Sequence, residues 1–419
     1  MTGRMSYDTL IVGGGIAGLY CARELLKHNP TMKVAMCEKY KRLGGRSTTF
    51  RKEGLQWEMG AGRIKNTHTL VLGLIKEYGL HTIPIGGGLQ FRETGASEYE
   101  ENYFEPAIDV LIKPLSLLPA SELGKHTLQE LLVKVHGPSE TQKWMDRFPY
   151  HSEMVTMRAD MAIREFLEEM NSHEGYSICK EGLSTLIDAM ASDIEGRGGQ
   201  ILSRHELVGF GDGWANFKVG SWTQGASRLG VRLDCKKLIL ALHANALRIL
   251  TPFKGWEPLS QVAMEPLLRI YASFSKPWLQ GMTRVVSTSP IRYFIPVGDR
   301  VGMISYTDAK FARHYMAILD SVGEGGLEKV VMKDLRALFP EISIDDPEAF
   351  KAHSWPEGVS YWLPGSYNPE AVSKAALHPF PSKYPGLYVC GESFSLRQGW
   401  MEGSLENAAE LLDKIDTNR

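Results

Sequence analysis

YDTLIVGGGIAGLYCARELLKH, residues 7–28, is the stretch that decides the fold. Its opening run up to Val12 is largely apolar and β-branched, which is typical of a buried strand. Glycines follow in the pattern G-x-G-x-x-G, and the remaining residues read as a helix that ends before Pro30. A second apolar strand over 33–37 closes on Glu38, 20 residues after Gly18. Strand, helix and strand in this order predict one βαβ unit.

The glycines meet different physical requirements in such a unit. Gly13 permits the tight turn, Gly15 lets the backbone approach a pyrophosphate, and Gly18 lets the helix pack closely on the strand. The helix N-terminus carries a partial positive charge, so the amides of Ile16 and Ala17 are expected to face the phosphates. We therefore predict a dinucleotide-binding site at this turn.

The residues after the second strand favour FAD over NAD. Glu38 accepts hydrogen bonds from ribose hydroxyls in either case, so the glycine motif alone leaves both cofactors open. A second glycine pair ends at Gly45 and is followed by Arg46, which would neutralise a pyrophosphate or steady the isoalloxazine edge. The small residues of Gly60-Ala61-Gly62-Arg63 let backbone lie against a flat ring. The alternative for each segment is a surface loop with a solvated arginine.

A strand, an acidic turn and a helix recur near the C-terminus. Residues 387–390 have the pattern of a buried strand, Glu392 follows, and Gly399-Trp400-Met401 opens a helix. This order predicts that the chain returns to the first sheet. Glu392 would then bond the ribityl or pyrophosphate side of the cofactor. Amides near Met401 would face the flavin O2 edge, where a helix dipole stabilises negative charge. The alternative is a helix that docks for stability alone.

Composition excludes several other classes of protein. The 419 residues carry 47 Lys and Arg against 49 Asp and Glu, so no basic excess exists for nucleic acid or an anionic membrane. The five cysteines are scattered and odd in number, which excludes a disulfide framework and a C-x-x-C metal site. No apolar run is long enough to span a bilayer, and the first one begins too early to follow a cleaved signal peptide. We therefore expect a cytoplasmic protein without a metal site.

Taken together, the motifs resemble those of the flavin-containing amine oxidase family, which includes monoamine, polyamine and L-amino-acid oxidases. The matching runs are G-G-G-I-A-G-L, L-G-G-R, E-M-G-A-G-R, C-G-E-S and G-W-M-E-G. The layout is most similar to that of the L-tryptophan oxidases of violacein biosynthesis. The resemblance implies an α/β fold: a Rossmann-like, GR2-type FAD-binding domain, a mixed-sheet substrate domain and a helical cap.

The resemblance also implies domains that are discontinuous in sequence. The FAD-binding domain would take residues 1–75, 198–255 and 385–419, the substrate-binding domain 76–120 and 256–384, and the helical domain 121–197. We expect strands over 200–203, 206–210 and 215–219 and helices over 152–170 and 183–194. Family members contact adenine through a backbone group at the position of Leu207, so the resemblance implies this contact here.

Several residues on the substrate side follow from the same resemblance. In L-amino-acid oxidases the arginine of a G-x-x-R motif at Arg63 forks onto the substrate carboxylate, so Arg63 favours an amino acid over a bare amine. Trp400 falls where the family places one wall of an aromatic cage. Tyr306 and Asp308 look like positions near the substrate. The alternatives are a structural salt bridge, a packing residue at a helix start, and a core tyrosine followed by a turn aspartate.

Two positions depart from the family pattern. Arg269 stands where the family usually carries a lysine that reaches flavin N5 through water. Arginine keeps the charge but cannot act as a base at neutral pH. Monoamine oxidases link the flavin to a cysteine, whereas residues 355–359, which occupy that region here, contain none. FAD is therefore expected to bind noncovalently.

These residues predict an FAD-dependent oxidase that converts an L-amino acid, aromatic or apolar in its side chain, to the imino acid. Hydride transfer would go to flavin N5, with O2 consumed and H2O2 produced. The close alternative is a polyamine or monoamine oxidase. A flavin-dependent isomerase or desaturase-like protein, or an inactive flavin-binding protein, is the alternative of another class, and a homodimer stays open. The expected catalytic residues are Arg63, Arg269, Tyr306 and Trp400.

Overall fold

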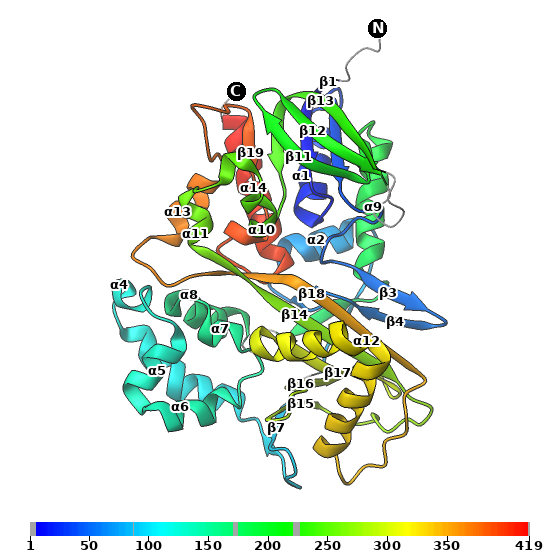
Figure 1. Cartoon of the computed structure of the whole chain (residues 1–419), viewed down its shortest axis with the longest axis vertical. Helices are drawn as coiled ribbons and strands as arrows, with labels where there is room; N and C mark the ends of the chain where they lie inside the picture. The colour runs from blue at the N-terminus through cyan, green and yellow to red at the C-terminus, as the bar shows by residue number, and fades with distance from the viewer. Residues whose placement is uncertain (1–5, 87, 171–174, 221–226, 418–419) are drawn as a thin grey trace. The chain divides into compact units, whose positions relative to one another are not determined.

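The computed structural model describes residues 6–86, 88–170, 175–220 and 227–417 (Figure 1). By its internal packing the chain divides into two compact units. The first unit comprises Met1–Pro84, Tyr176–Val262 and Tyr367–Arg419, and the second comprises Ile85–Gly175 and Ala263–Ser366. Both units are therefore assembled from segments that lie far apart in the sequence. The domain limits expected from the sequence remain a prediction.

The first unit is built on a seven-stranded sheet that begins with the predicted βαβ unit. β1 (Ser6–Val12) lies between β2 (Val34–Glu38) and β13 (Ser227–Leu240), and both pair with it in parallel. β19 (Leu387–Val389) pairs in parallel with β13, so the predicted return of the chain to the first sheet is confirmed. The remaining strands are β10 (Gln200–Ser203), β11 (His205–Gly211) and β12 (Trp214–Gly220), close to the limits expected from the sequence.

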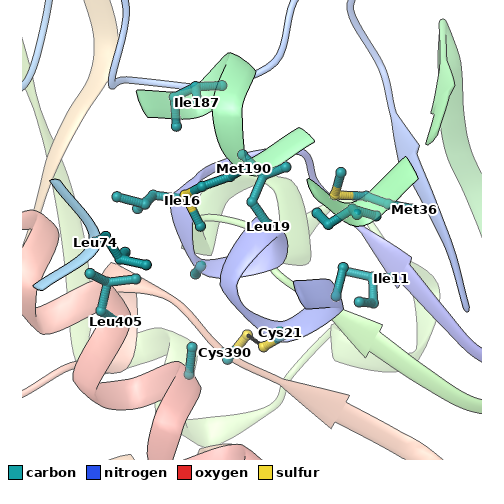
Figure 2. Close-up of a cluster of buried hydrophobic side chains, with 14 of the residues drawn as sticks. Ile11, Ile16, Leu19, Cys21, Met36, Leu74, Ile187, Met190, Cys390 and Leu405 are labelled. Atoms are coloured by element: carbon teal, nitrogen blue, oxygen red, sulfur yellow. Dashed lines mark hydrogen bonds between the residues drawn. The ribbon is translucent and has the colours of Figure 1, made fainter. Parts of the chain in front are cut away.

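One helix forms the centre of the first unit's core. α1 (Ile16–His28) packs against α9 (Leu183–Gly196) and α14 (Met401–Thr417). Figure 2 shows Leu19 and Cys21 of α1 surrounded by apolar side chains from these helices and from the sheet. α1 is buried on more than one face because elements from three parts of the sequence cover it. Shorter helices of this unit are α2 (Thr69–Glu77), α10 (Ala244–Arg248), α11 (Glu257–Ser260) and α13 (Pro369–Ala376).

Two small sheets complete the first unit. β3 (Thr49–Lys52) and β4 (Leu55–Glu58) form an antiparallel hairpin. β9 (Tyr176–Cys179) pairs with both β5 (Ile64–Lys65) and β6 (Thr82–Pro84). The pairing of β9 with β5 places Tyr176 directly opposite Lys65.

The second unit contains another seven-stranded sheet, in the order β18-β14-β17-β16-β15-β7-β8. Leu268, Ile270 and Ala272 of its strand β14 lie in an apolar core with α12, which bends at Gly323. Because side chains alternate along a strand, Arg269 and Tyr271 lie on the opposite face. The strands are β7 (Leu89–Arg92), β8 (Glu100–Glu101), β14 (Val262–Ser273), β15 (Arg284–Ser287), β16 (Tyr293–Pro296), β17 (Val301–Asp308) and β18 (Ala349–Trp362), and α12 spans Ala309–Leu338.

The single helix expected over residues 152–170 is wrong. The structure has α7 (Ser152–Val155), α8 (Ala159–Arg164) and a π-helical turn over Glu165–Glu169. Arg158 breaks the helix because its backbone is extended and its N–H donates to Trp362 O at 2.9 Å. No proline or glycine marks this break, since it depends on a contact distant in sequence. Four α-helices precede this segment in the described residues of the second unit: α3 (Phe104–Ala107), α4 (Ala120–Leu123), α5 (Leu128–His136) and α6 (Pro138–Met145).

Candidate active site

The glycine-rich turn before α1 has the shape that an anionic group requires. Gly13 has a φ of +108°, and a Cβ added there would lie 2.3 Å from Ala241 O. A Cβ on Gly18 would lie 2.0 Å from Gly13 O, which explains the close packing of helix on turn. A Cβ on Gly15, by contrast, would meet no described atom within 4 Å. Gly15 is the N-cap of α1, and among the described residues no side chain caps the helix there.

These features fit a pyrophosphate bound at the turn. The first turn of α1, which begins with Ile16 and Ala17, contains no acidic residue. Amides at an uncapped helix start attract an anion, and the open side of Gly15 leaves room for one beside the backbone. The predicted roles of the turn therefore fit the structure around it.

Glu38 stands at the end of β2 in a fixed orientation. Its Oε2 accepts the N–H of Gly14 at 2.8 Å, and its Oε1 accepts the N–H of Tyr40 at 2.8 Å. A pocket of about 530 Å³ is lined by Tyr40, Lys41 and Arg42, which follow Glu38 closely in the sequence. These contacts leave the ribose-binding prediction for Glu38 in place.

Arg42 is a candidate cofactor residue that our sequence analysis missed. Its Nη1 donates to Gly45 O and to Thr48 Oγ1, both at 2.7 Å. Burial lowers the pKa of Arg42, and the Glu38 carboxylate opposes that shift. The sequence signal for Arg42 is its position between Glu38, the expected ribose-binding residue, and the second glycine pair.

The second glycine pair packs against the first turn. Gly44 N–H donates to Gly14 O at 2.8 Å, and a Cβ on Gly45 would lie 3.6 Å from the Cα of Gly15. Both positions have φ between +56° and +93°, which favours glycine. The two glycine motifs therefore form one surface.

Arg46 and Glu392 join the N-terminal and C-terminal motifs. Arg46 Nη1 lies 3.1 Å from Glu392 Oε2, and Glu392 Oε1 accepts the N–H of Gly399 at 3.0 Å. The Gly60-Ala61-Gly62-Arg63 segment runs beside Arg46, because Ala61 N–H donates to Arg46 O at 2.9 Å. Predicted cofactor residues from both ends of the sequence are thus brought together.

Two further cofactor candidates lie in the same unit. Met401 is buried and is the first residue of α14. Leu207 is buried in β11, next to Glu206, whose carboxylate pairs with Lys39 at 2.8 Å. Leu207 is therefore in the strand that contacts the loop after Glu38.

Arg63 and Trp400 meet in an arginine–aromatic cluster, which we define as Arg63, His68, Tyr176 and Trp400. The guanidinium carbon of Arg63 lies 4.8 Å from the ring centroid of Tyr176 and 5.3 Å from that of Trp400. The rings of Tyr176 and Trp400 are nearly parallel, 6° apart with centroids 6.3 Å apart. Our sequence analysis missed Tyr176, since only the pairing of β9 with β5 brings it here.

The acid of G-W-M-E-G, Glu402, has a structural task. Glu402 accepts the N–H of Leu70 at 2.8 Å and that of Val71 at 2.9 Å, so it caps the start of α2 from α14. This cap fixes α14 next to α2, and with it the position of Trp400. The motif therefore combines an aromatic site residue with the carboxylate that holds its helix in place.

Arg269 and Tyr306 meet in the second unit. They lie directly opposite each other on β14 and β17, and the Arg269 guanidinium carbon is 5.1 Å from the Tyr306 ring centroid. Tyr150 and Tyr293 each have a ring centroid 6.1 Å from that of Tyr306. The structure thus groups the four predicted catalytic residues as two pairs, one in each unit.

Asp308 and Glu153 form a buried acidic pair in the second unit. Asp308 accepts the backbone N–H groups of His151 and Ser152 at 2.8–3.2 Å, which caps α7. Glu153 accepts the Tyr361 hydroxyl at 2.9 Å, and its Oε2 has no hydrogen-bond partner among the described residues. Burial first, and then the neighbouring carboxylates, raise the pKa of Glu153 well above its usual range.

The described part of the chain contains no metal site and no membrane-spanning helix. Over those residues no group of three His, Cys, Asp or Glu is placed to hold a metal ion. No helix there is long and apolar enough to cross a membrane. All five cysteines are buried free thiols.

A family model for flavin containing amine oxidoreductases matches residues 16–411. The chain belongs to the flavin-containing amine oxidoreductase family. The predicted family, enzyme class and FAD cofactor are thereby confirmed.

Curated relatives differ in how much of this flavoenzyme they match. An L-amino-acid oxidase of Mus musculus is 23% identical over 470 residues, covering 98% of this chain and 70% of that protein. A putative flavin-containing monoamine oxidase of Mycobacterium tuberculosis is 42% identical over 77 residues, covering 18% of this chain and 16% of that one. Human flavin-containing amine oxidase B is 34% identical over 79 residues, 19% of this chain and 15% of that one. The monoamine oxidase matches thus cover only a small part of either protein.

Solved structures agree on the fold. Wild-type putrescine oxidase bound to putrescine matches with a TM-score of 0.75 at 14% identity, covering 98% of this chain and 99% of that one. A putative protoporphyrinogen oxidase from Exiguobacterium sp. 255-15 matches with a TM-score of 0.72 at 17% identity, covering 100% of both chains. The predicted α/β class with an FAD-binding fold is confirmed.

Proposed function

We propose that this flavoenzyme oxidises an L-amino acid with an aromatic or apolar side chain to the imino acid and releases H2O2. The observation that carries the proposal is Arg63, which follows the Gly60-Ala61-Gly62 segment and lies against Tyr176 and Trp400. Similarity to an L-amino-acid oxidase over 98% of this chain supports the same reading. An amine oxidase without a carboxylate to bind has no need of a guanidinium at this position.

The residues of the first unit divide the work of binding. The amides at the start of α1, together with Arg46, would hold the pyrophosphate, and Glu38 would hold the ribose. Bound FAD supplies the oxidation, because it accepts two electrons and a proton from the amino-acid α-carbon and passes the electrons to O2. Arg63 would hold the substrate carboxylate through two parallel N–H···O bonds, which fixes the α-carbon relative to the cofactor segment. Trp400 would form one wall of the aromatic cage around the substrate amine.

Arg269 and Tyr306 are proposed to be catalytic residues. As an arginine, Arg269 contributes a positive charge and hydrogen-bond donors and is not suited to remove a proton. The ring of Tyr306, 5.1 Å from the guanidinium carbon, limits the orientations that Arg269 can take. Their substitution should therefore affect rate without abolishing FAD binding.

The test compares substrates that differ only in the carboxylate. Peroxide release is measured with L-tryptophan against tryptamine and with L-phenylalanine against phenethylamine, with putrescine and spermidine included. We expect turnover of the amino acids, and Arg63→Met should lower their kcat/KM by about 100-fold or more, because a charge-assisted bidentate contact is lost. Arg164→Met removes a surface arginine that pairs with Glu168 and serves as the matched control. Turnover of amines alone would contradict the proposal.

Oxidation of a diamine is the second candidate, favoured by the buried acidic pair. Glu153 has a carboxyl oxygen without a partner among the described residues, and a distal ammonium that pairs with it would favour its ionised form. This candidate predicts that putrescine is oxidised and that Glu153→Gln raises its KM with little change for L-phenylalanine. An unchanged KM for putrescine would remove the support from Glu153.

A further inference from the structure

The orientation of Arg63 depends on aromatic rings that come from two other parts of the chain. An arginine side chain has many rotamers, and a carboxylate is bound bidentately only when the guanidinium plane is presented correctly. The ring centroids of Tyr176 and Trp400 both lie within 5.3 Å of its guanidinium carbon, which is inside the range of cation–π attraction. The two rings thus restrict the same guanidinium.

Each ring is itself held by its surroundings. Tyr176 is buried at the start of β9 and pairs with Lys65, two residues after Arg63 on the neighbouring strand. Because directly opposed residues share one face of a sheet, the Tyr176 ring has little freedom to leave Arg63. Trp400 is held by α14, which the Glu402 cap fixes to α2, and by the edge of His68 with centroids 5.0 Å apart.

His68 contributes without adding charge. Burial lowers the pKa of His68 to about 4, so its ring is neutral near pH 7. A neutral ring packs against Trp400 without adding a second charge to the cluster. The arginine–aromatic cluster therefore carries a single positive charge, that of Arg63, next to the rings of Tyr176 and Trp400.

We infer that Tyr176 is a positioning residue for carboxylate binding, because its ring, parallel to that of Trp400, holds the Arg63 guanidinium in a preorganised orientation. The inference rests on the proposed function, in which Arg63 binds the substrate carboxylate. It makes Tyr176 a determinant of selectivity for carboxylates over amines, through its effect on Arg63. No motif of the sequence marks this residue.

The test measures binding of benzoate, a carboxylate without an amine, to the FAD-loaded full chain by calorimetric titration. Tyr176→Leu keeps an apolar side chain but removes the π face, and it should weaken benzoate binding about tenfold. Tyr176→Phe keeps the ring and should bind within about twofold of the unchanged protein. Tyr78→Leu is the matched control, because Tyr78 also lies under an arginine, Arg23 at 5.4 Å, outside the cluster. Steady-state kinetics should show Tyr176→Leu raising KM for L-phenylalanine about tenfold with kcat changed less.

The variant Arg63→Met separates the proposed function, carboxylate binding by Arg63, from the positioning role of Tyr176. Lost benzoate binding in Arg63→Met with weakened binding in Tyr176→Leu supports both. Lost binding in Arg63→Met with unchanged binding in Tyr176→Leu would overturn the positioning role alone. Unchanged benzoate affinity in Arg63→Met would overturn the proposed function, and the role of Tyr176 with it. Flavin content and melting temperature of each variant identify any that fold poorly, and Tyr176→Phe then decides the role by rescue.

Discussion

Glu38 in the first unit and Glu153 in the second are both buried glutamates, but their surroundings differ. Glu38 accepts backbone N–H groups on both carboxylate oxygens, so its charge is compensated by fixed dipoles of the turn. Glu153 accepts one tyrosine hydroxyl and lies near other carboxylates, and its pKa is raised well above the usual range. The first unit therefore holds a glutamate whose charge is met by backbone dipoles, whereas burial and neighbouring carboxylates in the second unit favour the protonated form of Glu153.

The largest expected effect contrasts two glycines of the first unit that lie two residues apart. Gly13→Ala places a methyl group 2.3 Å from Ala241 O at a φ of +108°, and should destabilise the protein by about 3 kcal/mol. Gly15→Ala adds its methyl to open space, so it should fold normally but bind FAD more weakly. Melting temperature and flavin content measure the two effects. Equal melting temperatures for the two variants would show that the turn tolerates a side chain at Gly13.

The next prediction sharpens the contrast between the two glutamates. The raised pKa of Glu153 means that the folded protein holds a proton that the unfolded chain releases above the ordinary value of about 4.5. Stability should therefore fall as pH rises above that value, with a slope of at most about 1.4 kcal/mol per pH unit. Glu153→Gln should remove this slope and be at least as stable as the unchanged protein near pH 7. Denaturant unfolding between pH 4 and 8 measures it, and an identical pH profile in the variant would show that Glu153 is ionised when folded.

The smallest expected effect is the labelling of the cysteine thiols in the native protein. All five cysteines belong to the first unit. Burial raises the pKa of Cys235 to about 12 and that of Cys179 to about 11, and each thiol is shielded from solvent. A thiol reagent at pH 7.5 should label none of the five in minutes and all of them in denaturant. Added FAD should slow any residual labelling, because ligand binding opposes opening of the unit that binds it. Rapid labelling of the native protein would indicate that the first unit opens readily.

Most of the first unit could be predicted from the sequence because the motifs that indicate it are local. The strand ending at Val12, the glycines at 13–18 and Glu38 are close enough in sequence for one βαβ unit to be recognised. Arg46 and Glu392 were each predicted on their own motif, and the ion pair between them follows from the return of β19 to the sheet.

What could not be predicted depends on contacts between distant segments. Tyr176 enters the arginine–aromatic cluster only through the pairing of β9 with β5. The helix expected over 152–170 breaks where Arg158 bonds Trp362 O, and no residue type signals that break. Asp308 caps a helix that begins at Ser152, a role that no residue near it in the sequence indicates. In each case the partner lies far along the chain, beyond the reach of periodicity or spacing.

The pairing of β19 with β13 sets an order of events during protein synthesis. β1 and the glycine turn leave the ribosome early, but Glu392 and Trp400 are made more than 350 residues later. Until then the parallel edge of β13 lacks its β19 neighbour, and Arg46 lacks its Glu392 partner. A nascent chain therefore has a dinucleotide turn well before it has a complete cofactor site. Capture of FAD should therefore be a late step of maturation.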